Sequence, residues 1–186
     1  MTRNDILEAA AQVFRQKGFH GASMADIAEA VNLQKASLYH HVTSKQEILF
    51  EILDRALVLL LERISPLARL DLPADERLRQ MICEYLQILA ENTDLSAVLL
   101  FEHRSLEGRQ HARHLPNRDK FEALWREVLQ DGVRTKRFAC EDVAVTARAI
   151  LGIMNWTITW YRPNGALTIR QIAEQYSNLL LNGLLK

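Results

Sequence analysis

The segment from Ser23 to Lys45 constrains the fold of this chain more than any other part of the sequence. It reads SMADIAEAVNLQKASLYHHVTSK. Ile27, Ala28 and Val31 recur at the spacing of one helical face and are expected to pack inward. A break follows, and then a second short stretch with helical period. The segment therefore predicts two short helices joined by a tight turn, which is the arrangement of a helix-turn-helix.

The ends of these short helices carry residues that can cap a helix or form a tight turn. Ser23 can cap the first helix, with Asp26 three residues further on. Asn32 falls at the sharp bend, and Asn is one of the few side chains that tolerate a left-handed backbone. Leu33 and Leu38 are then expected to face the core. The polar side chains that point away from the core are Gln34, Lys35, Ser37, Tyr39 and His40.

The segment resembles the motif of the TetR family of bacterial one-component regulators, which reads roughly T-x-x-D-I-A-x-x-A-G-V-S-x-G-x-L-Y-x-H-F-x-x-K. The matching residues here are Ser23, Asp26, Ile27, Ala28, Leu38, Tyr39, His41 and Lys45. The departures are Asn32, Gln34, Ala36 and Val42, and none of them removes a group that the fold needs. With matches in the preceding helix, the resemblance is specific over residues 3–50.

The resemblance implies that the second helix of the motif reads the major groove of DNA. The residues implied to bind DNA are Ser23, Gln34, Lys35, Ser37, Tyr39, His40 and Lys45. By their chemistry, Lys35 can reach a guanine edge or a phosphate, and Gln34 can pair with adenine through two hydrogen bonds. Tyr39, His40 and Lys45 are better suited to phosphate oxygens. The alternative is that these are ordinary solvated surface residues.

The charge of the chain indicates that DNA would be bound through individual side-chain contacts and not through a broad basic surface. The 186 residues include 23 basic and 23 acidic side chains, so the net charge is zero. Residues 1–46 hold five basic residues against four acidic ones, a balance of only +1. DNA affinity is therefore expected to come from individual side chains, from helix N-termini and from two-fold symmetry.

Several classes of protein are not indicated. The N-terminal sequence is charged early, which argues against a signal peptide, and no apolar run reaches the roughly 18–20 residues that span a bilayer. The two cysteines, Cys83 and Cys140, lie far apart and fit a reducing cytosol. No catalytic motif occurs, and the spacing of His103, His111 and His114 does not suit zinc. We therefore expect a cytoplasmic protein that makes no membrane contact, is not an enzyme and needs no cofactor or metal.

Helical periodicity along the whole chain predicts an all-α fold of about nine helices. Residues 1–46 are expected to form the helix-turn-helix DNA-binding domain, and residues 47–186 a ligand-binding and dimerisation domain. The first helix is expected to run from about Arg3 to Lys17, with Gly18 directly after its end. A long helix is expected to begin at Lys45, after Ser44, and to stop at Pro66. Pro116 is expected to open a later helix. The other helices are predicted over about 75–91, 95–106, 141–161 and from Thr168 to the C-terminal region.

The apolar run AILGIMNWTITWY at residues 149–161 predicts a contact between subunits. A helix that is apolar on nearly all sides must be covered on both of its faces. One face can pack on its own subunit, and the other, together with the last helix, can form a two-fold four-helix bundle, as the family resemblance implies. The alternative is an interior helix of a monomer.

Aromatic and apolar residues spread over separate helices of the larger domain could line a ligand cavity. The candidate ligand-binding residues are Tyr85, Leu89, Phe101, Phe121, Trp125 and Trp156. The alternative for each of them is ordinary core packing. Residues 103–120 carry a charge balance of +3 and could bind phosphate beside such a cavity, or could form an exposed basic loop. The run LGIMNWTITWYRPNG also resembles regulators of the same family that sense CoA thioesters, which suggests an acyl-CoA effector.

These observations favour a ligand-responsive transcriptional repressor. It would bind a palindromic double-stranded DNA operator as a homodimer and be released by a small-molecule effector, for which a CoA thioester is the suggested class. The principal alternative is an architectural or nucleoid-associated DNA-binding protein without an effector. A small helical enzyme would require a catalytic constellation that the sequence lacks.

Overall fold

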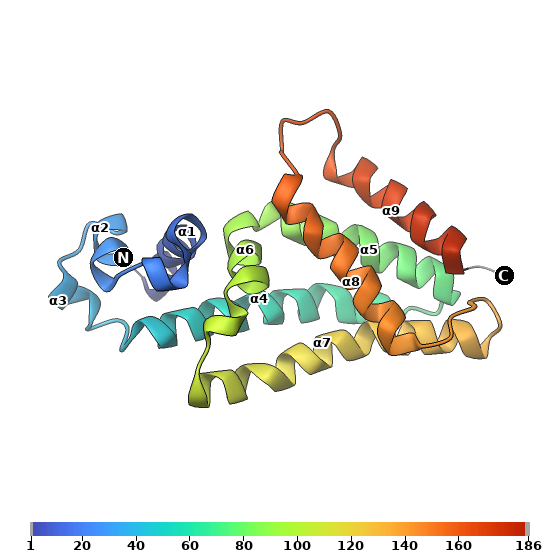
Figure 1. Ribbon diagram of the computed structural model, residues 1–186, viewed down its shortest axis with the longest axis horizontal. Helices are drawn as coiled ribbons and strands as arrows, with labels where there is room; N and C mark the ends of the chain where they lie inside the picture. The colour runs from blue at the N-terminus through green and yellow to red at the C-terminus, as the bar shows by residue number, and fades with distance from the viewer. Residues whose placement is uncertain (1, 185–186) are drawn as a thin grey trace. The chain divides into compact units, whose positions relative to one another are not determined.

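The computed structural model describes residues 2–184, which form nine α-helices and one 3-10 turn joined by short loops (Figure 1). The helices are α1 Arg3–Gly21, α2 Met24–Ala30, α3 Lys35–Leu38, α4 Lys45–Ala68, α5 Ala74–Glu91, α6 Thr93–Phe101, α7 Gly108–Arg134, α8 Val143–Trp160 and α9 Ile169–Leu184. The 3-10 turn covers His103–Ser105, between α6 and α7. The predicted all-α class is confirmed.

The chain divides into two compact units. The first, called the head unit here, comprises the described residues up to Val58 together with Asn92–Asn117. The second, called the body unit, comprises Leu59–Glu91 and the described residues from Arg118 onward. The head unit therefore contains α1, α2, α3 and α6, and the body unit contains α5, α8 and α9, while α4 and α7 contribute to both.

Helix α1 begins and turns where its sequence indicates. Thr2 caps it, with Asp5 as the reciprocal partner of a capping box. The predicted C-terminal Gly18 has a φ of +71°, which a residue without a Cβ adopts at no steric cost, and the backbone kinks there before one further helical turn. The buried face of α1 includes Ile6, Leu7, Ala10, Val13 and Phe14, as its periodicity predicts. Phe19, directly after the kink, is buried edge-on against Phe14.

The two internal prolines do not act as predicted. Pro66 lies inside α4, which continues to Ala68, and Pro116 lies inside α7, which begins earlier at Gly108. A proline removes one backbone donor and its ring crowds the carbonyl four residues earlier, but the remaining backbone hydrogen bonds carry both helices past it. In α4 the loss falls in the last turn. The predicted helix over 95–106 was also too long, because α6 ends at Phe101 and a 3-10 turn follows.

In the body unit, α5 packs against both α8 and α9. Asp142 caps α8 by accepting hydrogen bonds from the backbone N–H groups of Ala144 and Val145, at 2.7 and 3.0 Å. Thr168 and Gln171 form the capping pair predicted at the start of α9. Among residues 2–184, no helix combines the length and the apolar character that a membrane crossing requires.

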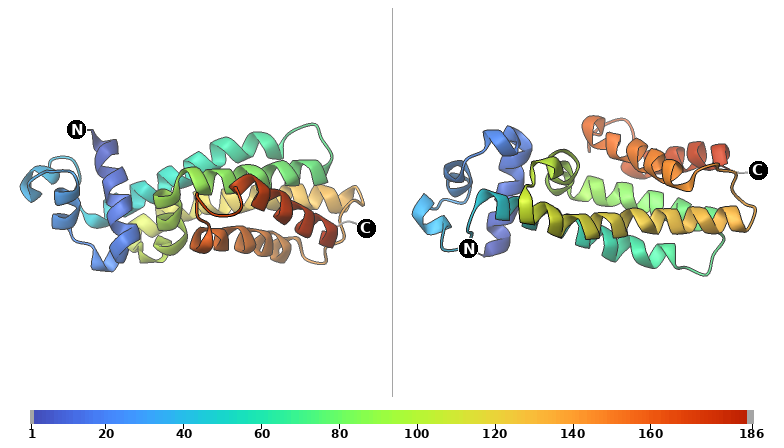
Figure 2. Two further views of the ribbon diagram at one scale, coloured as in Figure 1. Left: turned by 90° about the horizontal axis from the view of Figure 1, so that it is seen from above. Right: turned by 60° about the horizontal axis from the view of Figure 1, so that its bottom comes forward.

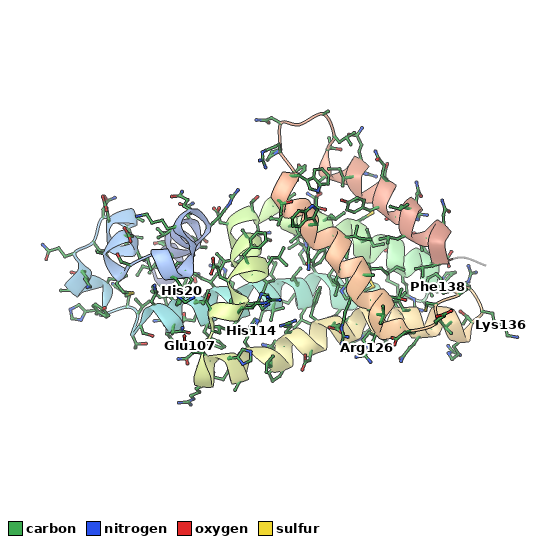
Figure 3. The ribbon with its side chains drawn as sticks, in the orientation of Figure 1. His20, Glu107, His114, Arg126, Lys136 and Phe138 are labelled. Atoms are coloured by element: carbon green, nitrogen blue, oxygen red, sulfur yellow. The ribbon has the colours of Figure 1, made fainter. Side chains whose placement is uncertain are left out.

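Phe138, labelled in Figure 3, packs closely on the end of α7. A Cβ atom added at Gly132 would lie 2.0 Å from a ring carbon of Phe138, so only glycine permits this approach. The backbone N–H of Phe138 also donates to the carbonyl of Gly132 at 3.0 Å. Lys136, with a φ of +58°, turns the chain after α7, and the Phe138 ring packs back over Gly132.

Candidate DNA-binding face and effector site

A capping box holds helix α2 of the predicted helix-turn-helix. The Asp26 carboxylate accepts from the backbone N–H of Ser23 at 2.7 Å, and the Ser23 hydroxyl accepts from the backbone N–H of Asp26 at 3.2 Å. The Lys17 ammonium lies 2.6 Å from the same carboxylate. This ammonium, together with the hydrogen bonds from Ser23, holds the pKa of Asp26 well below its usual range. Ser23, a predicted DNA-binding residue, is therefore already engaged in the cap.

The turn between α2 and α3 has the predicted geometry. Asn32 has a φ of +53°, which confirms the left-handed backbone expected at this position. The backbone N–H of Leu33 donates to the carbonyl of Ala28 at 2.8 Å, and this bond draws the chain back across the end of α2. Ala28 and Leu38 are buried, whereas Leu33 is half-buried.

Helix α3 presents the polar face that the sequence predicts. Gln34, Lys35, Tyr39 and His40 are exposed, and Ser37 is half-buried. The Gln34 side chain makes no capping hydrogen bond, so its amide is available to a partner. Within the head unit, α1 lies between the α2–α3 pair and α6 (Figure 1, Figure 2). Helix α3 therefore lies on the far side of α1 from α6.

Most basic side chains of residues 2–46 are used within the head unit. Arg3 pairs with Glu51 and also donates to the His41 carbonyl. Arg15 pairs with Asp94 at 2.7 Å, and Lys17 pairs with Asp26 as described above. The Lys45 ammonium donates to two backbone carbonyls of the head unit. Within this described range, Lys35 alone among the Lys and Arg side chains has neither an ion pair nor a hydrogen bond.

Three of the predicted ligand-binding residues form one aromatic cluster in the body unit. The Phe121 ring lies 5.9 Å from the Tyr85 ring, and the Trp125 ring lies 5.8 Å from Tyr85 and 6.2 Å from Phe121, measured between centroids. Leu89, one turn after Tyr85 on α5, is also buried. The structure thus brings four of the six candidates into the core of one unit.

The cluster contains two buried polar groups with different environments. The Tyr85 hydroxyl donates to Oδ1 of Asn155 on α8, and burial raises the pKa of Tyr85 above its usual value. The indole Nε1–H of Trp125 is buried and has no hydrogen-bond acceptor among the described residues. A buried donor without an acceptor is costly, so it marks a position where a ligand carbonyl would be stabilising.

The other two candidates lie elsewhere. Phe101, at the end of α6 in the head unit, is 55% exposed, and Trp156 on α8 is 66% exposed. An open groove of about 490 Å³ in the body unit, between α5 and α9, is lined by none of the six. Its lining includes Arg79, Glu84, Arg170 and Glu174, so charged groups of both signs surround it.

The basic segment 103–120 is only partly a loop. It covers the 3-10 turn and the first half of α7. Arg113 lies over the Phe50 ring, 4.1 Å from its centroid, and His114 is buried. The described part of the chain holds no group of three His, Cys, Asp or Glu side chains placed to bind a metal ion.

Helices α8 and α9 carry the largest exposed apolar side chains of the body unit. One face of α8, with Ala147, Ile150 and Met154, is buried. The exposed apolar residues on the two helices are Val145, Ile153, Trp156, Trp160 and Leu179. We call this set the α8–α9 face. Exposed apolar area of this kind is typical of a surface that contacts another protein.

The chain matches known families over nearly its whole length. The family model described as "Bacterial regulatory proteins, tetR family" matches residues 6–62, and the one described as "Tetracyclin repressor-like, C-terminal domain" matches residues 71–184. The chain belongs to the TetR family. It is accordingly a transcriptional regulator with a helix-turn-helix DNA-binding segment, as the resemblance in residues 3–50 implied.

Individual TetR proteins are similar to this chain from end to end. The HTH-type transcriptional repressor KstR2 of Mycobacterium tuberculosis is 28% identical, over 99% of this chain and 93% of its own length. The structure of the regulator PfmR from Thermus thermophilus is 36% identical and superposes with a TM-score of 0.87, over 97% of this chain and 99% of that one. The structure of AibR in complex with isovaleryl coenzyme A and operator DNA is 28% identical, with a TM-score of 0.90, over 96% of this chain and 97% of that one.

Sequence reasoning missed some residues that organise this TetR structure. Asn155, which accepts the Tyr85 hydrogen bond, was a detectable signal, because it is the one amide side chain in the mostly apolar run 149–161. Gln46 was not detectable, since its partners Ser105 and Glu107 are about 60 residues away in the sequence. Such pairs become visible only once the chain is folded.

Proposed function

We propose that this TetR protein is a homodimeric repressor that binds a palindromic operator and is released by a small-molecule effector of the acyl-CoA class. The observation that carries the proposal is the exposed polar face of α3, held by a capped α2 and a left-handed turn at Asn32. Similarity to AibR, whose structure includes isovaleryl coenzyme A and operator DNA, supports the choice of ligand and target.

DNA recognition is assigned to the side chains on and around α3. Lys35 and Gln34 at the start of α3 are suited to base edges, and Tyr39 and His40 to phosphate oxygens. With one subunit supplying so little free positive charge, two subunits on a two-fold operator would provide the required contacts. The division into a DNA-binding domain over 1–46 and a ligand-binding and dimerisation domain over 47–186 belongs to this proposal.

Dimerisation is assigned to the α8–α9 face. Two copies related by a two-fold axis would cover the exposed Trp156 and Leu179 in a four-helix bundle. Trp156 is therefore moved from the proposed ligand site to the proposed dimer contact.

The effector site is assigned to the cluster of Tyr85, Leu89, Phe121 and Trp125. An acyl chain would replace part of this packing, and the thioester carbonyl would accept from the unpartnered Nε1–H of Trp125. The exposed Phe101 is left out of the proposed site. Of the basic segment 103–120, Arg118 and Lys120 lie in the body unit with this cluster, and they are the candidates for the phosphates of the coenzyme.

Two measurements test this function. First, random duplex DNA is selected with the purified protein, and enrichment of a palindromic site by a dimer is the expected result. Second, isovaleryl-CoA is compared with CoA and isovalerate in thermal unfolding. A ligand at 100 times its Kd adds about 2.7 kcal/mol, or roughly 5–10 °C for a chain of this size.

A thermal shift with the thioester alone supports the effector assignment. Trp125→Phe keeps the ring and removes the N–H, so it should reduce that shift, whereas the matched Trp156→Phe should not. No shift with any thioester, together with enrichment of many unrelated sites, would favour the effector-free architectural alternative.

A further inference from the structure

Two consecutive residues at the start of α4 reach different parts of the head unit. The Nζ of Lys45 donates to the backbone carbonyls of Phe19 and Ala22, both at 2.7 Å, and lies 4.4 Å from the centroid of the Phe19 ring. The neighbouring Gln46 donates from Nε2 to the carbonyl of Ser105 at 2.8 Å and accepts at Oε1 from the backbone N–H of Glu107. Lys45 and Gln46 are both half-buried.

The two carbonyls bound by Lys45 lack their usual helical donors. The partner of the Phe19 carbonyl in a continuous helix would be the N–H of Ser23, but that group is bound to the Asp26 carboxylate. The corresponding partner of the Ala22 carbonyl would be the N–H of Asp26, which is bound to the Ser23 hydroxyl. The capping box of α2 thus leaves two acceptors at the end of α1, where partial negative charge collects, and an ammonium suits them.

The bond from Lys45 to Ala22 also closes the helix-turn-helix segment into a loop. The segment starts immediately after Ala22, passes through α2 and α3, and returns at Lys45. With its two ends tied together, α3 has fewer orientations available than in an open segment. Gln46 then attaches the same turn of α4 to the connection between α6 and α7, where Glu107 is labelled in Figure 3.

We propose that Lys45 is a positioning residue for DNA recognition and not a phosphate ligand, and that Gln46 completes the attachment of the helix-turn-helix to the α6–α7 connection. Lys45 sets the orientation of α3 by closing its loop, and Lys35 supplies the cation that meets DNA. This proposal rests on the DNA-binding function above, and it assigns Lys45 a different role from the one that the family motif implies.

The roles of Lys45 as positioning residue, phosphate ligand or general stabiliser differ in their effects on binding. Loss of a phosphate contact lowers the slope of log affinity against log salt by about 0.9 per subunit and weakens specific and non-specific binding together. Loss of folded protein weakens specific and non-specific binding by the same factor and leaves the salt slope unchanged. Misorientation of α3 weakens specific binding while non-specific attraction to phosphates persists.

The experiment compares Lys45→Met, which keeps the apolar stem over the Phe19 ring but lacks donors, with Lys35→Met as the matched control. Each variant is titrated with the duplex selected by the wild-type protein and with an unrelated duplex, between 50 and 200 mM salt, at a temperature where circular dichroism shows it folded. For Lys45→Met we expect a loss of specific affinity of about tenfold or more, with the salt slope and the non-specific affinity unchanged. Lys35→Met should lower the slope.

A reduced slope for Lys45→Met would overturn the proposal and make Lys45 a phosphate ligand, and equal losses on both duplexes would make it only a stabiliser. If Lys45→Met does not fold, Lys45→Gln serves instead, because it keeps a short donor without the charge. The proposal expects an unchanged salt slope for this variant, whereas a phosphate ligand at this position would give a reduced slope.

Gln46→Ala should speed amide exchange at Glu107 and lower the ratio of specific to non-specific affinity. An unchanged ratio would remove Gln46 from the proposal. Failure of the wild-type protein to select any DNA would instead refute the DNA-binding function itself.

Discussion

The head and body units each have an apolar core, and they differ in the side-chain interactions that supplement it. In the head unit, polar side chains bind backbone groups: Ser23 and Asp26 cap α2, and Lys45 and Gln46 bind carbonyl and amide groups of distant loops. In the body unit, rings and aliphatic side chains pack around Tyr85 and Trp125. Directional bonds hold α3, which is four residues long and buries only Leu38. The longer helices α5 and α8 are held instead by extended apolar faces.

The largest expected effect lies on the α8–α9 face of the body unit. Trp156→Glu would place a charge in the proposed four-helix bundle, and loss of a central Trp contact typically weakens an interface by 2 kcal/mol or more, about a 30-fold change in Kd. We expect the variant to elute as a monomer in size-exclusion chromatography with light scattering. Arg170→Ala, on the polar side of α9, is the control. A dimer that survives Trp156→Glu would exclude this face.

The next largest expected effect concerns a close contact in the body unit, between Gly132 and the Phe138 ring. Gly132→Ala places a Cβ against the Phe138 ring and should cost about 1–3 kcal/mol of unfolding free energy. Gly21→Ala, in α1, is the matched control, because its Cβ would meet only the Cβ of Lys17, at 3.9 Å. Chemical denaturation of both variants measures the difference. Equal stability of the two variants would show that the Phe138 contact does not constrain the body unit.

Next in size is the cap of α2 in the head unit. Ser23→Ala removes the acceptor for the Asp26 N–H and should cost about 1 kcal/mol, whereas Ser23→Gly should cost only a few tenths. Hydrogen exchange of the α2 amides reports this local change better than global unfolding does. Exchange in Ser23→Ala as slow as in the wild type would mean that the side-chain cap contributes little to the head.

The smallest expected effect is the response of the head unit to acid. The pKa of Asp26 is lowered in the folded state by Lys17 and Ser23, so its contribution is present above the unfolded value of about 4 and is lost as the pH falls below it. The protection of the α2 amides, taken relative to their intrinsic exchange rate at each pH, should therefore fall below about pH 4 in the wild type. Asp26→Asn should show the low protection already at neutral pH and little further loss on acidification. A wild-type-like acid response in this variant would assign the response to other carboxylates.

Local features of the head unit could be predicted from residues close in sequence. Asn32 at the bend, Ser23 at the cap and Gly18 at the end of α1 each act through neighbours within four positions. Helix boundaries at Pro66 and Pro116 were predicted wrongly, because one missing donor does not end a helix whose other bonds remain. The aromatic residues Tyr85, Phe121 and Trp125 were recognised as candidates, but not which of the candidates meet.

The sequence by itself determined the all-α class, the helix-turn-helix and the caps, because each depends on spacings of three or four residues along one helix. Only the tertiary structure decided that Lys45 is directed at backbone carbonyls, that Gln46 binds the α6–α7 connection and that Phe101 and Trp156 are exposed. These outcomes depend on side chains that pack or bond across distances of twenty residues or more in the sequence. A one-dimensional pattern shows which side chains can make such contacts, and the fold selects the ones that do.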